Sequence, residues 1–137
     1  MDDSRKDWTD QVNREMGPFN RHVGLRAESV SRGFCRLRCE IRPEHLNPRG
    51  TVHGGMSATM LDVAGGVAAI YAGDEPRPVV TQSSDLHYLR PLTGSVMIAE
   101  GTVIKAGRHT CLARADLYDD QGRLCCTGQL DLYYLDA

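Results

Sequence analysis

The sequence predicts an α+β domain in which an antiparallel sheet wraps around one long helix. Two observations predict this class: one long run of small and apolar residues at about 52–72, and strand-like runs on both sides of it with short turn signals between the later ones. The 137 residues fit one compact domain, since two separate cores would be hard to fill at this length. We therefore expect residues 1–137 to form a single domain, with residues 1–18 as an N-terminal helical extension.

A short helix and two strands are expected first. Residues 5–16 have the pattern of an amphipathic helix, which Gly17 and Pro18 should stop, because proline lacks the amide proton and disfavours helix before it. Strands are expected at about 22–30 and 33–41. The second strand alternates with the period of a half-buried strand, and its apolar face carries Cys35, Leu37, Cys39 and Ile41.

The long helix, at about 52–72, follows a loop at 42–51. Its large apolar residues recur at spacings of three and four, which one helix face requires. The predicted buried stripe is Val52, Met56, Met60, Val63, Val67 and Ile70. Most of its other residues are small, so we expect other backbone to approach this helix closely and wrap it.

Four strands should complete the domain, at about 78–90, 95–106, 109–119 and 124–135. Residues 106–109 indicate a hairpin, and residues 119–123 indicate a turn. One helix covers only one face of a sheet, so the other face and the edges stay wet or need a partner, which favours a homo-oligomer. The polar run "TQSSD" at 81–85 fits either an edge or solvated loop, or a polar pocket or subunit interface.

Composition excludes several classes of function. The net charge of −2 does not indicate a nucleic-acid binder, and no apolar run is long enough to cross a membrane. The charged first residues lack an apolar signal core, so we expect a cytoplasmic protein. The five cysteines are odd in number and lack zinc-like spacing. We interpret them as small buried hydrophobes rather than as a disulfide framework or a catalytic thiol, and we expect no metal and no cofactor.

A glycine pair, Gly54 and Gly55, stands at the start of the long helix. The first amides of a helix have no intrahelical acceptor and carry the positive end of the helix dipole, so they can polarise a carbonyl. Glycine would leave those amides accessible, or it would permit close packing of a crossing strand. His53, directly before the pair, is a candidate cap or packing residue, and alternatively a base.

Asp62 is a carboxylate among apolar neighbours. If enclosed, it must be hydrogen-bonded, lie at an interface or titrate abnormally, and it could then act as a base or a nucleophile. The alternative is an acid that faces solvent or bonds a neighbouring strand. Gly54 and Asp62 of one chain lie roughly 12 Å apart along the helix axis, at 1.5 Å per residue. If both are catalytic, Asp62 must therefore come from a neighbouring subunit.

Four basic residues lie near the ends of predicted strands: Arg90, Lys105, Arg108 and His109. They fit solvated strand ends. Alternatively, they form a patch for the phosphates of a large nucleotide-bearing ligand, because clustered cations favour phosphate.

The pattern N-x-x-G-x-V-H-G-G-x-x-A-T-x-x-D, from Asn47 to Asp62, resembles the hotdog-fold thioesterases, specifically their phenylacetate-degradation-type (PaaI-like) branch. The resemblance extends through "YLRP" at 88–91, "KAGR" at 105–108 and "DDQGRLCCTG" at 119–128. It covers roughly residues 20–135, and its implied fold is a central helix wrapped by an antiparallel sheet, paired into dimers and often tetramers.

The resemblance implies hydrolysis of acyl-CoA thioesters to free acid and CoA. The Gly54 amide would polarise the thioester carbonyl, and Asp62 of the opposite subunit would activate water or attack directly. Asn47 would help to place the water or the carbonyl, and His53 would support the thioester end of the substrate. Thr81 would lie near the catalytic carboxylate, and the four basic residues above become possible CoA contacts. The alternative function is a hotdog protein that binds CoA esters without turnover.

Overall fold

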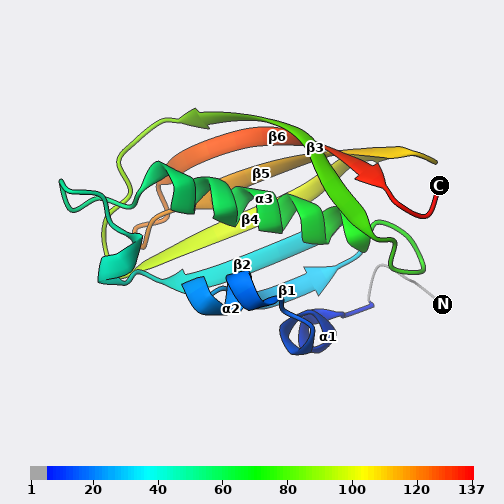
Figure 1. The fold of residues 1–137 in the computed structure, drawn as a ribbon, viewed down its shortest axis with the longest axis horizontal. Coiled ribbons are helices and arrows are strands. Elements are labelled where there is room, and N and C mark those ends of the chain that lie inside the picture. The colour runs from blue at the N-terminus through cyan, green and yellow to red at the C-terminus, as the bar shows by residue number, and fades with distance from the viewer. Residues whose placement is uncertain (1–5) are drawn as a thin grey trace.

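The computed structural model describes residues 6–137 as a six-stranded antiparallel sheet curved around one long helix (Figure 1). The strand order is β1-β2-β4-β5-β6-β3, and every neighbouring pair is antiparallel. This arrangement confirms the predicted α+β class and the hotdog fold. Residues 1–5, which begin the predicted extension and its helix, lie outside the described residues.

The N-terminal part contains one helix more than predicted. Helix α1 spans Thr9–Arg14 and helix α2 spans Pro18–Val23, ahead of strands β1 (Arg26–Ser31) and β2 (Phe34–Glu40). Pro18 occupies the first turn of α2, where its fixed φ suits a helix and its missing N–H is not needed. Gly24 ends the helix in the left-handed conformation, with φ of 89°. The prediction of a strand from residue 22 was therefore wrong at its start.

The remaining elements follow the prediction to within two residues at each end. They are helix α3 at Gly54–Ile70 and strands β3 (Val79–Tyr88), β4 (Val96–Ala106), β5 (Thr110–Tyr118) and β6 (Leu124–Tyr134). A 3-10 turn at Pro43–His45, inside the expected loop, was not predicted. Helix α3 lies along the inner face of the sheet, and β3 passes over one side of it (Figure 1).

The buried face of α3 differs from the predicted stripe. Met56 and Met60 are buried as expected, but Val63, Val67 and Ile70 are only partly buried. The other buried positions of the helix are taken by Leu61 and by small residues, including Ser57, Ala64, Gly65 and Ala68. The reason is the close approach of helix and sheet: a Cβ on Gly101 of β4 would overlap the main-chain carbonyl of Ala64. At that spacing only small side chains fit between the two backbones, so the valines are turned aside.

Strand β3 forms one edge of the sheet and pairs only with β6. Residues 80–85 are exposed along it, and a bulge between Thr81 and Ser83 interrupts the ladder. The polar run "TQSSD" is thus an edge in this chain, as the first interpretation expected, and its Ser84 also lines a pocket, as the second expected. An edge strand leaves one row of peptide groups open to pairing with another chain.

The five cysteines are all free and buried. Four of them lie on β2 or β6, and Cys111 lies on β5. Burial raises the pKa of the Cys35 thiol to about 12, so the thiol stays protonated and weakly nucleophilic. Their interpretation as small buried hydrophobes is confirmed.

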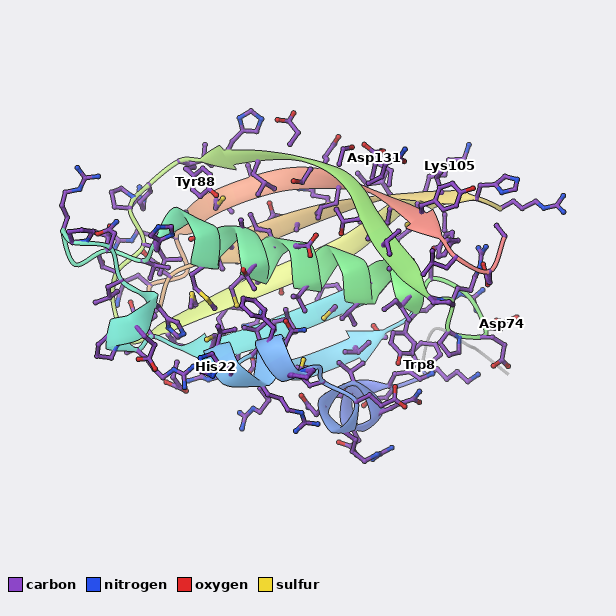
Figure 2. All side chains as sticks on the ribbon, in the orientation of Figure 1. Trp8, His22, Asp74, Tyr88, Lys105 and Asp131 are labelled. Carbon is purple, nitrogen blue, oxygen red and sulfur yellow. The ribbon has the colours of Figure 1, made fainter. Side chains whose placement is uncertain are left out.

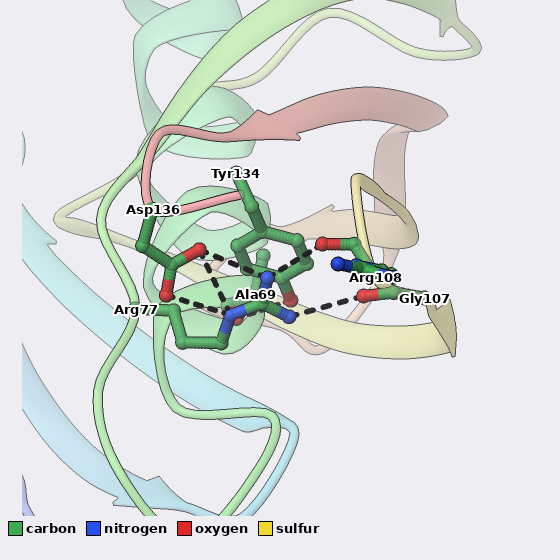
Figure 3. A network of polar contacts seen from close by, with 6 residues as sticks. All are labelled: Ala69, Arg77, Gly107, Arg108, Tyr134 and Asp136. Carbon is green, nitrogen blue, oxygen red and sulfur yellow. Dashed lines mark hydrogen bonds and ion pairs between the residues drawn. The ribbon is translucent and has the colours of Figure 1, made fainter.

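Arg77, in the segment after α3, joins three parts of the chain (Figure 3). Its guanidinium lies 3.7 Å from the centre of the Tyr134 ring and forms an ion pair with Asp136 at 2.9 Å. It also donates to the main-chain oxygens of Gly107 and Arg108, at 3.0 and 2.7 Å, in the hairpin between β4 and β5. These contacts hold the predicted hairpin against the C-terminal end of β6.

None of the helices within residues 6–137 has the length and apolarity that a bilayer crossing requires.

Candidate active site

Asp62 of α3 is held by a hydroxyl from the edge strand. The Thr81 Oγ1 donates a hydrogen bond of 2.6 Å to Asp62 Oδ1. Asp62 is exposed in the isolated chain, while the preceding residues Met60 and Leu61 turn into the core. The carboxylate thus faces outward and bonds a neighbouring strand, and Thr81 fixes its orientation through one oxygen.

A pocket of about 340 Å³ opens beside this carboxylate. Helix α3 forms one wall with Ala58, Thr59, Asp62 and Val63, and Ser84, Leu86 and Leu130 come from the sheet. Helix α2 supplies Phe19 and Asn20. Five of the nine lining residues are apolar, and the Asp62 carboxylate, which Thr81 orients, forms part of the wall.

His53 is the N-cap of α3. Its Nδ1 accepts the N–H of Gly55 at 2.8 Å, so a neutral ring carries its proton on Nε2. A Cβ on Gly55 would lie only 3.0 Å from His53 Nδ1, which explains the glycine at position 55. The expectation that His53 caps the helix is confirmed, and the cap occupies the Gly55 amide.

Gly54 lines a second pocket, of about 360 Å³, at the mouth of α3. A Cβ on Gly54 would meet the Tyr88 ring at 3.5 Å, an ordinary contact, so packing alone does not demand glycine here. The Tyr88 hydroxyl donates to the Gly54 carbonyl at 2.8 Å and ties the helix start to the end of β3. Glycine at position 54 leaves no side chain beside the first-turn amide, at a residue that lines the pocket.

Asn47 builds the loop that leads into α3. Its Oδ1 accepts the main-chain N–H groups of Arg49 and Thr51, at 3.0 and 3.2 Å. Its Nδ2 donates to Thr51 Oγ1 at 2.8 Å. Asn47 also lines the Gly54 pocket, so it shapes the site, and its role in placing water stays a prediction.

The two halves of the candidate site do not meet within one chain. Gly54 and Asp62 line different pockets, and eight helical steps from one residue to the other correspond to about 12 Å. Thr81 belongs with Asp62, whereas Asn47 and His53 belong with Gly54.

The four basic residues of the predicted phosphate patch are also divided. Arg90 lines the Gly54 pocket, whereas Lys105, Arg108 and His109 lie at the β4–β5 hairpin. Tyr88 and Lys105 mark these opposite ends of the molecule in Figure 2. The length of β3 separates them by about 30 Å, at 3.3 Å per residue. Arg49, which the sequence reasoning did not select, lines the pocket together with Arg90. Its place inside the motif loop was the available signal.

Residues 49–126 match the family model described as the thioesterase superfamily. The chain belongs to the thioesterase superfamily. The matched range contains Gly54, Asp62, Thr81 and Arg90, and of the site residues expected from the sequence only Asn47 lies outside it.

Characterised relatives and solved structures agree with this membership. The medium/long-chain acyl-CoA thioesterase YigI of Salmonella typhimurium is 28% identical over 118 residues, covering 75% of this chain and 76% of YigI. The structure of thioesterase HI1161 from Haemophilus influenzae superposes with a TM-score of 0.87 at 21% identity, over 98% of this chain and 95% of that one. The structure of the E. coli PaaI protein from the phenylacetic acid degradation operon superposes with a TM-score of 0.84 at 18% identity, over 93% of this chain and 91% of that one. The last two show the shared fold.

Proposed function

We propose that this thioesterase-superfamily protein hydrolyses acyl-CoA thioesters at a site shared between two copies of the chain. The observation that carries the proposal is the division of the site. Asp62, oriented by Thr81, faces outward from the middle of α3, and Gly54 lies about 12 Å away at the start of that helix. The name of the YigI relative supports an acyl-CoA ester as the substrate.

The chemistry follows from the two halves. The Gly54 N–H donates to the thioester oxygen, where negative charge develops, and one such donor contributes about 3–4 kcal/mol. Asp62 of the second copy takes a proton from water while the water oxygen attacks the carbonyl carbon. When the tetrahedral intermediate collapses, the carbon–sulfur bond breaks and the CoA sulfur receives that proton. Direct attack by Asp62 would instead break the carbon–sulfur bond, release the CoA thiolate, which takes up a proton from solvent, and form an anhydride that water then hydrolyses to the free acid and the Asp62 carboxylate.

Isotopically labelled water separates these two routes in a single turnover. With Asp62 as base, the heavy oxygen enters the product acid. With Asp62 as nucleophile, water that attacks the anhydride at the Asp62 carbonyl carbon places the heavy oxygen in the Asp62 carboxylate, so label found there by mass spectrometry of the peptide identifies the nucleophilic route.

The CoA end belongs to the Gly54 pocket in this proposal. Arg49 and Arg90 line it, and guanidinium groups bind phosphates well. Lys105, Arg108 and His109 lie at the far end of the same chain, so they do not join Arg90 within one copy, and their contact with CoA stays a prediction.

The first test replaces Asp62 with asparagine. We expect turnover of acyl-CoA to fall about a thousandfold or more, because the base is lost while the shape remains. Asp131→Asn is the matched control, since Asp131 also accepts a serine hydroxyl, that of Ser83 at 3.0 Å, on a surface strand. Turnover near that of the wild type in a folded Asp62→Asn variant would contradict the proposal. Binding of CoA esters without turnover by the wild type would favour the non-catalytic alternative.

The second test asks whether the site is shared. Asp62→Asn and Gly54→Val each disable a different half, so each variant alone should be inactive. In mixed dimers, one site combines the intact Gly54 of one copy with the intact Asp62 of the other. Coexpression should therefore restore up to about a quarter of the wild-type activity in a twofold-symmetric assembly. Mass-verified mixed dimers without activity, or an active monomer in light scattering, would rule out the shared site.

A further inference from the structure

A second hollow adjoins the Asp62 pocket along α3. Its volume is about 190 Å³, and its lining includes Val12 and Met16 from the N-terminal segment and Val67 and Ile70 from α3. Val63, which lines the Asp62 pocket, and Val67, which lines this hollow, lie one turn apart on the helix. The two spaces thus follow one another along the half-buried apolar side of α3.

Asn20 of α2 lines both spaces. Its neighbour Phe19 lines only the pocket beside Asp62, among those two. A polar residue therefore lies where the two spaces adjoin, and an aromatic ring borders the space that contains the carboxylate.

Helix α2 is anchored at both ends, so these two residues have a fixed place. The Arg21 Nε donates to the carbonyl of Met16 at 2.6 Å, before the helix. At the other end, Arg42 donates to the carbonyl of His22 at 2.6 Å, and the buried His45 bonds that of Val23 at 2.8 Å. Short helices are marginal alone, and these bonds supply the rigidity that the six residues of α2 lack.

Phe19 is 60% exposed although it borders this pocket. An apolar group that enters beside Asp62 would cover the ring and gain the free energy of removing both surfaces from water. Phe19, Val63 and Leu86 would then enclose it from three separate elements.

We propose that α2 determines which acyl groups this protein accepts, with Phe19 as the side wall of the acyl pocket and Asn20 as its end wall. The pocket beside Asp62 takes an acyl chain of medium length or a single aromatic ring, and Asn20 keeps longer chains out of the second hollow. The identity of the bound group as an acyl chain rests on the proposed function. Both residues are specificity-determining and take no part in the chemistry.

The test measures kcat/KM over a series of saturated acyl-CoAs of increasing length. Asn20→Ala should raise kcat/KM for the longest chains by about tenfold or more relative to the short ones, since each methylene moved into an apolar site contributes about fourfold. Phe19→Ala should shift the preference toward bulkier groups, and Phe19→Trp should shift it toward smaller ones. Leu135→Ala is the matched control, because Leu135 is 57% exposed and lies outside both hollows.

A double variant tests the second hollow itself. Val67→Phe fills that space, so it should cancel the gain that Asn20→Ala gives for long chains. A gain that persists in the double variant would overturn the role of Asn20 as an end wall.

A binding measurement separates this inference from the proposed function. Non-hydrolysable acyl-CoA thioethers of the same lengths are titrated calorimetrically into Asp62→Asn, alone and combined with each α2 variant. The same shifts in length preference support the inference, even where the wild type shows no turnover and the proposed hydrolysis fails. An unchanged length profile in the folded Phe19 and Asn20 variants overturns the inference, whatever the turnover.

Discussion

Thr81 and Asp62 are 19 residues apart in sequence, and the Thr81 hydroxyl donates to the Asp62 carboxylate at 2.6 Å. Hydrogen bonds to charged groups contribute about 1.5–3 kcal/mol. We therefore expect Thr81→Val to lower kcat about 10- to 100-fold, whereas Thr81→Ser should retain most of the activity. Ser83→Ala is the control on the same strand, since Ser83 bonds Asp131 instead. Equal activity of the valine and serine variants would show that the hydroxyl has no part in the reaction.

Gly54 offers a test in which stability and activity move apart. Ala fits at position 54, 3.5 Å from the Tyr88 ring, and replacing a helical glycine stabilises by up to about 1 kcal/mol, less at a first turn. A methyl group beside the amide displaces the carbonyl, and a misplacement of this size lowers kcat about a hundredfold. We expect Gly54→Ala to melt at the same or a higher temperature than the wild type and to lose activity.

Gly66→Ala is the control for Gly54→Ala on the same helix. A Cβ on Gly66 meets only Leu132, at 3.9 Å, and lies away from both pockets. The Gly66→Ala variant should be more stable than the wild type and should turn over substrate at the same rate. Full activity in Gly54→Ala would exclude the Gly54 amide as the polarising group.

The five cysteines should resist thiol reagents in the folded protein. Burial raises the pKa of Cys35 to about 12 and those of Cys39 and Cys126 to about 11, so little thiolate exists at pH 8. We expect no rapid labelling before denaturation and five labelled thiols after it. Leu135→Cys, which places a thiol at an exposed position, should label at once. Rapid modification of a native cysteine would contradict the buried arrangement.

Asp119 predicts how stability depends on pH. Burial raises the pKa of this carboxyl, but the N–H groups of Arg123 and Gln121 and the Arg123 guanidinium outweigh burial and hold the pKa below its ordinary value of 3.8. Because the pKa is lower in the folded state, the carboxylate stabilises the protein at any pH above its pKa in the unfolded chain. This stabilisation disappears as the pH falls through the pKa of the folded state. Asp119 is 2% exposed, so Asp119→Asn should cost about 1–3 kcal/mol at pH 7.

Denaturant titrations at several pH values check the Asp119 prediction. The difference between wild type and Asp119→Asn should be constant from pH 7 to about pH 5 and should shrink below 3.8. Asp85→Asn is the control, since the Asp85 side chain is 85% exposed. A difference that grows on acidification would have the wrong sign and would refute the assignment.

The strands could be predicted from sequence because their side chains alternate between core and solvent. Cys35, Leu37 and Cys39 are buried as the alternation required. Helix α2 was missed because Pro18 was interpreted as a stop, whereas it opens a new helix that Gly24 ends. A proline followed six residues later by glycine is the signal that could have revealed it.

The candidate site was predictable only in its local parts. The spacing from Gly54 to Asp62 fixed their separation, because a helix has a constant rise. The buried face of α3 was not predictable from the size of its residues, since the contact of Gly101 with Ala64 depends on tertiary packing. The separation of Arg90 from Lys105 likewise follows from strand pairing, which local patterns do not specify.

Arg77 bonds the hairpin through the main-chain oxygens of Gly107 and Arg108, which every amino acid would present in the same place. These Arg77 contacts therefore depend on the backbone conformation of the hairpin and not on its side chains. The side chain at position 108 can therefore change during evolution without loss of the contacts that hold the β4–β5 hairpin. For the same reason, new binding residues can be engineered at this hairpin while Arg77 keeps its backbone in place.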